Sequence, residues 1–158
     1  MEDIGKIIQN LRNAPNILAN LVKNIPADLL KKNRKNGKWC IHSHACHLAV
    51  SQPVLLDRFD KFIEQKQPEF RPYFPDKDFG ESYLLTLDLE EHLKLFRLYR
   101  KNLVEKIDLV NNDFWDKKAI HPEYEIYTPY IMLRHIMMHD YLHMYRIEEL
   151  WLTRPEYL

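Results

Sequence analysis

The sequence has 158 residues, of which 46% are hydrophobic and 29% charged, and its 23 Lys and Arg balance its 23 Asp and Glu. This length predicts a single domain over residues 1–158, and the balanced charge gives no basic excess of the kind that nucleic-acid binding requires. The sequence has only three glycines and no glycine-rich phosphate-binding or hydrolase motif, which favours long helices over sandwiches, barrels and nucleotide-binding folds.

Apolar residues at helical spacing predict the first helices in chain order. The first helix covers about 3–23, with a kink at Pro15, and a polar link over 24–38 follows it. The second covers about 39–65, and Pro53 inside it predicts a bend because proline cannot donate to the Ala49 carbonyl. A proline-rich connection over 66–82 leads to a third helix over about 83–107.

The last helix has the clearest start. Residues 109–127 are predicted to form a loop, and the fourth helix covers about 128–151, with Thr128 as its N-cap and Pro129 at its first position. Four helices of this length predict an all-α four-helix bundle. The long 66–82 segment suits a crossover connection between the second and third helices.

Two of the eight histidines point to a metal site. His139 and His143 lie four residues apart within the apolar stripe of the last helix, so their side chains stack on one face. This H-x-x-x-H spacing in a core is typical of divalent-metal binding, and a pair of hydrogen-bonded core histidines is the alternative interpretation. Since two imidazoles rarely hold a metal alone, a third ligand is expected from another helix.

Helical periodicity leaves that third ligand open. On the second helix, His44 lies nearer the centre of the apolar stripe than His47, while His42 points away towards solvent. His92 lies inside the stripe of the third helix and is a candidate ligand, supporting partner or packing residue. His135, at the flank of the last helix's stripe, is expected at the surface or in support of the site.

Three motifs resemble the DinB-like superfamily and follow one another in the order and spacing of that family over nearly the whole chain. They are Gly37-Lys38-Trp39 with His47-Leu48, then His121-Pro122-Glu123-Tyr124 with Tyr127-Thr128, and finally His139-Asp140-Tyr141-Leu142-His143. Two positions depart from the family's pattern. Cys40 stands where the family often has Ser or Thr, and Arg146 stands where it often has Gln.

The resemblance implies that His47, His139 and His143 are the ligands of one divalent ion (zinc, nickel or iron), which selects His47 over His44. Three imidazoles leave open positions, where an ion can acidify water or hold a thiol as thiolate. Branches of the family are thiol-dependent S-transferases. We therefore expect a metal-dependent thiol S-transferase or hydrolase acting on a small electrophile, with a low-molecular-weight thiol as cosubstrate that Tyr141 and Arg146 help to position.

A non-enzymatic metal-binding bundle, serving as a sensor or interaction module, is the alternative, and it gains if His92 completes the coordination. The expected partners are a small-molecule thiol and electrophile, with no nucleic acid. No apolar run approaches 18 residues and the N-terminus has no apolar signal core, so we expect a cytoplasmic protein without a membrane partner. Large aromatic residues in loops and at helix ends predict a homodimer: Tyr73, Phe74, Phe79, Tyr83, Trp115 and Tyr157.

Overall fold

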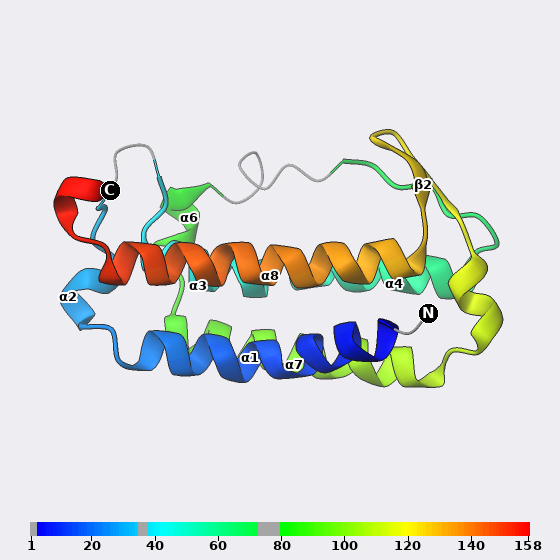
Figure 1. The fold of residues 1–158 in the computed structure, drawn as a ribbon, viewed down its shortest axis with the longest axis horizontal. Helices are drawn as coiled ribbons and strands as arrows, with labels where there is room; N and C mark the ends of the chain where they lie inside the picture. The colour runs from blue at the N-terminus through cyan, green and yellow to red at the C-terminus, as the bar shows by residue number, and fades with distance from the viewer. Residues whose placement is uncertain (1–2, 35–37, 73–79) are drawn as a thin grey trace.

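The predicted amphipathic segments form a four-helix bundle in the computed structural model, which describes residues 3–34, 38–72 and 80–158 (Figure 1). The long helices are α1 (Ile4–Lys23), α3 (Ile41–Val50), α4 (Gln52–Glu64), α7 (Leu89–Leu109) and α8 (Pro129–Leu152). Shorter elements are α2 (Ala27–Leu30), α6 (Glu81–Leu84), the 3-10 helices η1 (Asn112–Asp116) and η2 (Pro155–Tyr157), and strands β1 (Ala119–His121) and β2 (Tyr124–Tyr127).

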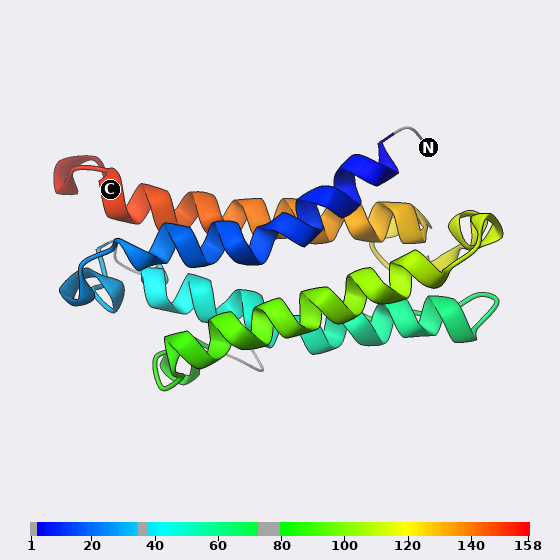
Figure 2. The same ribbon diagram turned by 90° about the horizontal axis from the view of Figure 1, so that it is seen from below.

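The helices follow the predicted crossover topology. The rod formed by α3 and α4 runs in the same direction as α7, while α1 and α8 run the opposite way (Figures 1 and 2). Because α4 ends and α7 begins at opposite ends of the bundle, the chain between them crosses over. Both α1 and α3 pack against α7 and α8, so the α3–α8 contact forms one seam of the bundle.

A buried polar layer divides the core into two apolar clusters. Leu11, Phe59 and Leu103 belong to the cluster nearer the β1–β2 hairpin, and Leu18 and Ile147 belong to the other. Between the two clusters along α4, α7 and α8 lie the side chains Gln52, Arg100 and Asp140, each about 1% exposed. The histidines considered below lie at the edge of this layer.

The second predicted helix is two helices rather than one bent helix. The break falls at Ser51, where α3 ends and α4 begins, because Pro53 occupies the first turn of α4, the part of a helix that tolerates proline. The Ser51 hydroxyl and the Gln52 side-chain amide both donate to the Leu48 carbonyl, at 3.2 and 2.8 Å. Side chains thereby satisfy a carbonyl at the end of α3.

The third predicted helix starts later than expected. Residues 81–84 form the separate helix α6, and α7 begins at Leu89 with Asp88 as its N-cap, whose carboxylate accepts from the Glu91 amide at 2.7 Å. At the last helix, Thr128 is the N-cap as predicted, and its hydroxyl accepts from the Ile131 amide.

The segment predicted as a loop over 109–127 contains a small antiparallel hairpin. Its strands β1 and β2 pair Ala119 with Tyr127 and His121 with Tyr124, with an irregular register between the pairs. Ile120 joins the hairpin to the segment after α4: its amide donates to the Pro68 carbonyl at 2.8 Å, and its carbonyl accepts from the Phe70 amide at 2.9 Å. These bonds fix the hairpin over the end of the bundle.

The aromatic residues on which the homodimer prediction rests lie in different surroundings. Tyr73, Phe74 and Phe79 lie outside the described residues. Tyr83 and Tyr157 are exposed, but Trp115 is half-buried and packs against the hairpin-end core, with its ring centroid 5.2 Å from that of Phe114. Among the described residues, no helix combines the length and apolarity needed to cross a membrane.

Candidate metal centre

Three histidines from two helices converge at the α3–α8 seam. His47 comes from α3, and His139 and His143 come from successive turns of α8, as the sequence predicted for their places on the helices. One nitrogen from each ring lies within 4.8 Å of the other two. The Nε2 atoms of His47 and His139 are 3.0 Å apart, so these two rings point directly at each other.

Burial keeps these imidazoles neutral. Desolvation lowers the pKa of His47 to about 3, with the neighbouring His139 and His44 adding to the effect. Desolvation also lowers the pKa of His143 strongly and that of His139, although the nearby Asp140 carboxylate acts against the change at His139. Neutral imidazole is the form that ligates metals, so the cluster is ready to bind at neutral pH.

The three rings fit a divalent transition-metal ion. Nitrogens bound at about 2.0–2.1 Å to one tetrahedral zinc lie roughly 3.3 Å from each other, close to the separation of the His47 and His139 Nε2 atoms. The Nδ1 atoms of the same two residues are buried and have no hydrogen-bond partner in the part of the chain that the structure describes. Imidazole nitrogen suits zinc, nickel, iron and copper, so the donor set selects none of these.

His44 and Trp39 surround the cluster from the start of α3. The Nδ1 atom of His44 lies 2.9 Å from Nδ1 of His143, so His44 contacts the cluster without belonging to the three nitrogens that converge. The half-buried Trp39 ring lies 4.9 Å from His47 and 6.0 Å from His143, measured between ring centroids. Helical periodicity did not indicate that Trp39 forms a wall of the site, because a residue that precedes a helix follows no such periodicity; the family motif that contains Trp39 was the one available signal.

The structure corrects the solvent exposure predicted for His42 and shows the surroundings of His92. His42 is not solvated: it is 2% exposed, and its Nε2 contacts the Leu87 carbonyl at 3.0 Å, because α6 and the turn after it cover this face of α3. His92 bonds to the Asp88 carbonyl of its own helix at 2.7 Å and is not part of the three-histidine cluster. His92 therefore does not fill an open ligand position.

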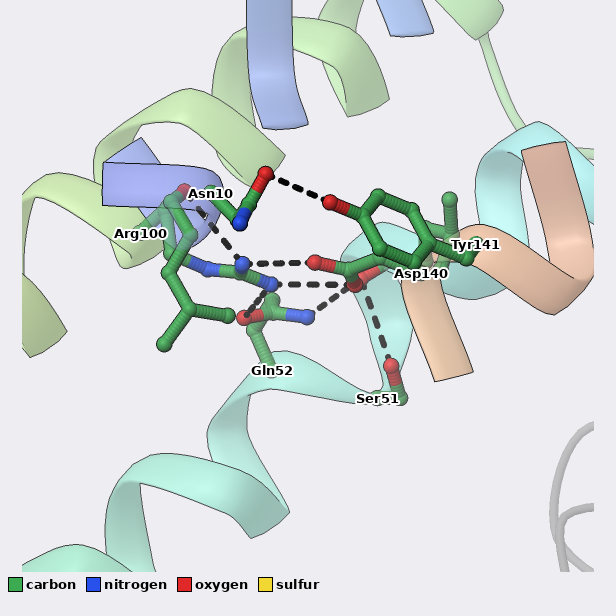
Figure 3. Close-up of polar contacts among 8 residues, drawn as sticks. Asn10, Ser51, Gln52, Arg100, Asp140 and Tyr141 are labelled. Atoms are coloured by element: carbon green, nitrogen blue, oxygen red, sulfur yellow. Dashed lines mark hydrogen bonds and ion pairs between the residues drawn. The ribbon is translucent and has the colours of Figure 1, made fainter. Parts of the chain in front are cut away.

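The residues expected to position a cosubstrate point elsewhere. The Tyr141 hydroxyl donates to the Asn10 side chain on α1 at 2.5 Å (Figure 3). A rotation of about 100° per residue places Tyr141 on the side of α8 opposite His139 and His143. Arg146 pairs with Glu149 on the exposed surface at 2.6 Å and influences the site only through its charge near His44. The expectation for Tyr141 is therefore wrong in geometry.

A buried ion pair between Arg100 and Asp140, the residue next to His139, is drawn in Figure 3. Arg100 on α7 donates from Nη1 and Nη2 to the two carboxylate oxygens of Asp140, at 2.6 and 3.1 Å. The guanidinium also donates to the Gln52 side chain at 3.3 Å and to the Leu11 carbonyl at 3.4 Å. Since Asp140 follows His139 directly, this network ties the turn of α8 that carries His139 to α1, α4 and α7.

A cavity of about 220 Å³ adjoins the cluster at His139. Its walls come from α4, the β1–β2 hairpin and α8, and they include Arg58, His121, Tyr124 and His135. His135 is half-buried, with its ring centroid 5.0 Å from that of Tyr124. Burial lowers the pKa of both His121 and His135, so both rings are neutral near pH 7.

The two cysteines offer no nucleophile to this cavity. Both Cys40 and Cys46 are buried, and neither lies on its lining. Desolvation raises the pKa of Cys46 to about 12, which keeps it a thiol. A thiolate is the reactive form of cysteine, so the Cys46 side chain is inert at neutral pH.

Comparison with known proteins agrees with this architecture. A family model described as the DinB superfamily matches residues 10–147. A protein of Oceanobacillus iheyensis, whose name gives metal-dependent hydrolase as its provisional activity, is 24% identical over 120 residues, or 76% of this chain and 69% of that protein. The structure of YfiT from Bacillus subtilis, described as a probable metal-dependent hydrolase with an unusual four-helix bundle topology, matches with a TM-score of 0.83 and 24% identity. That match covers 92% of this chain and 84% of the YfiT chain.

Proposed function

The chain belongs to the DinB superfamily, and we propose from its histidine geometry that it is a metal-dependent hydrolase of small molecules. His47, His139 and His143 are the proposed ligands of one divalent ion. The observation that carries the proposal is the convergence of three neutral imidazoles within 4.8 Å beside a cavity that shares His139. The provisional name of the Oceanobacillus relative supports the same reaction class.

An ion held by three neutral ligands would keep its full positive charge and act as a Lewis acid. It would also lower the pKa of a water molecule enough for that water to serve as a nucleophile near neutral pH. The protein must then supply a proton acceptor. His135 meets this requirement, since it is neutral, lines the cavity and lies one helical turn before His139. In the proposed reaction, His135 takes the proton of the attacking water and returns it to the leaving group.

His121 complements this role as a hydrogen-bond donor. Its Nδ1 accepts from the Glu123 amide at 3.2 Å, so the proton of the neutral ring resides on Nε2. Trp39 and the neighbouring rings shield the histidine cluster from bulk water on the other side. The chain therefore places a base, His135, and a hydrogen-bond donor, His121, on the walls of the same cavity.

Transfer of a low-molecular-weight thiol to a small electrophile is the second candidate. The charge of the site favours it: three neutral ligands leave the ion's positive charge uncompensated, and a thiolate would neutralise part of it. Because both cysteines of the chain are buried, the thiol would have to be a cosubstrate. Activity that requires an added thiol would support this candidate over hydrolysis.

The test begins with protein purified without a histidine tag, whose bound metal is measured by mass spectrometry. A panel of small esters and amides is then assayed with metal-loaded protein, metal-stripped protein and His139→Ala. We expect hydrolysis by the loaded protein alone. His135→Gln should lower kcat by about 10²- to 10⁴-fold, while the adjacent exposed control Arg134→Gln should not. Equal rates for the loaded, stripped and His139→Ala proteins would leave the non-enzymatic metal-binding bundle as the better account.

A further inference from the structure

The cavity beside His139 contains a cation that the proposed reaction does not use. Arg58 on α4 lines it and is half-buried. The Nη2 atom donates to the Arg71 carbonyl at 2.6 Å, and the guanidinium lies 5.6 Å from the centre of the Phe70 ring. These contacts hold the side chain in place without neutralising its charge.

No carboxylate forms an ion pair with Arg58 among residues 3–34, 38–72 and 80–158. Its neighbour Asp57 pairs with Lys61 at 2.7 Å instead. Of the residues that the structure describes, Glu123 is the one acidic residue on the cavity lining, and its side chain is exposed. Among the described residues, the charge of Arg58 therefore has no paired carboxylate in the cavity.

Aromatic rings cover the wall between Arg58 and the histidine cluster. The ring centroids of His121 and Tyr127 are 4.8 Å apart, and those of Tyr127 and His135 are 5.6 Å apart. The charge of Arg58 also acts on the Tyr127 hydroxyl, and both side chains line the cavity, so this wall adjoins the guanidinium. Such a wall fits a flat, apolar molecular body rather than a strongly hydrated one.

We propose that this cavity binds a small substrate with an anionic head group, a carboxylate or a phosphate, held by Arg58, and a flat apolar body against the aromatic wall. The inference rests on the proposed hydrolase, because the bond to be cleaved must reach the histidine cluster at His139. The planar guanidinium matches both kinds of anion with paired hydrogen bonds. The cavity size restricts the ligand to roughly that of one substituted ring.

Binding to metal-stripped protein tests the anion site separately from catalysis. The probes are benzoate, phenylphosphonate and neutral benzamide, measured by calorimetry. We expect at least one of the two anions to bind more tightly than benzamide. The variant Arg58→Gln should weaken anion binding by about 10- to 100-fold. Tight binding of benzoate alone assigns a carboxylate substrate, and tight binding of phenylphosphonate alone assigns a phosphate.

Two further variants separate charge from folding. Glu123→Gln removes the exposed carboxylate and should tighten anion binding or leave it unchanged, with no effect on benzamide. Arg12→Gln, on the far groove between α1 and α7, should bind all probes as the wild type does. Equal binding of benzoate, phenylphosphonate and benzamide, or no anion binding at millimolar concentration, would overturn the proposal. So would unchanged affinity in Arg58→Gln or weaker anion binding in Glu123→Gln.

A hydrolysis assay distinguishes failure of this inference from failure of the proposed function. Metal-loaded protein is offered monomethyl terephthalate, which has a distal carboxylate, and neutral methyl benzoate. A lower KM for the terephthalate that disappears in Arg58→Gln supports the anion site. Hydrolysis of both esters with equal KM refutes the site and keeps the hydrolase, whereas selective anion binding without any hydrolysis keeps the site and refutes the hydrolase.

Discussion

The guanidinium of Arg100 and the carboxylate of Asp140 form a two-bond ion pair in which each side chain is only 1% exposed. The pair lies between the two apolar clusters of the core and next to His139. Removal of one charge from such a pair leaves the other buried without compensation, whereas removal of both does not.

We therefore expect Asp140→Asn and Arg100→Met each to lower the free energy of unfolding by about 3–5 kcal/mol. The double variant Arg100→Met/Asp140→Leu should be more stable than either single variant. Urea unfolding measures all three. The exposed pair Arg12–Asp108 is the matched control, and its loss should cost less than about 1 kcal/mol. A double variant that is less stable than both single variants would contradict this account.

His44 and His92 should differ in their effect on metal binding. His44→Ala removes the ring nitrogen 2.9 Å from Nδ1 of His143, so the orientation of that proposed ligand becomes less fixed. We expect about 10- to 100-fold weaker metal affinity, measured by competition with a chelator. His92→Ala should retain the wild-type affinity, because its ring bonds to Asp88 on a separate helix.

Acid should destabilise the metal-free protein. The unfolded chain takes up protons at its histidines below about pH 6.5, while burial holds the pKa of His47 in the folded state at about 3. Between these values the unfolded state binds more protons, so the free energy of unfolding falls as pH falls, by about 1.4 kcal/mol per pH unit for this histidine. The free energy of unfolding of His47→Gln, measured in urea, should depend less steeply on pH than that of the wild type. An equal slope for the two proteins would argue against the lowered pKa of His47.

Metal affinity should change little over the same range. The ligands must be neutral, and burial lowers the pKa of all three histidines, that of His47 to about 3, so protons compete weakly with the ion above that range. Chelator titrations near pH 7.5 and near pH 5 measure the difference directly. A loss of affinity of about 10-fold or more between the two values, as expected for imidazoles with the ordinary pKa near 6.5, would contradict the lowered pKa values.

Removal of the metal should leave the helical fold in place. Both apolar clusters pack without the cluster histidines, so far-UV circular dichroism of stripped and loaded protein should agree. Metal at 100 times its dissociation constant should add about 2.7 kcal/mol to the free energy of unfolding, seen as a higher thermal midpoint. Loss of helix on chelation would mean that the ion is a structural requirement.

The homodimer prediction is open to a direct measurement. Tyr83 and Tyr157 expose 43% and 76% of their surface, and aromatic side chains are enriched at interfaces. Light scattering at micromolar concentration should give twice the mass of the 19.2 kDa chain. A monomeric mass would contradict the prediction.

Helix positions and the pairing of His139 with His143 were predictable because an i, i+4 spacing places side chains on one face whatever lies around the helix. The choice between His44 and His47 was not. Periodicity measured along one helix of 39–65 places His44 nearer the stripe centre, but the chain breaks at Ser51, so the stripe of α4 does not define the face of α3. The family resemblance, rather than the spacing, identified the histidine that joins the cluster.

Contacts between different helices could not be predicted either, because periodicity describes each helix by itself. Arg100 reads as an ordinary charged residue of α7, and only the position of Asp140 on α8 makes its burial tolerable. The hairpin was missed because its strands are only three and four residues long and β2 exposes three of its four side chains, so no alternation of apolar residues marks them. The solvation expected for His42 failed because α6 covers it.

The short β1–β2 hairpin can change in sequence with little effect on the packing of the helices. Its residues form much of one wall of the cavity, yet it contributes few side chains to the packing of the four long helices. Ile120 fastens it to the bundle through two backbone hydrogen bonds, which do not depend on side-chain identity. Substitutions at Glu123 and Tyr124 can therefore change which ligand the cavity prefers while the helices and the histidine cluster stay constant. For the same reason, the tip of this hairpin is the natural place to diversify a library of variants with new specificities.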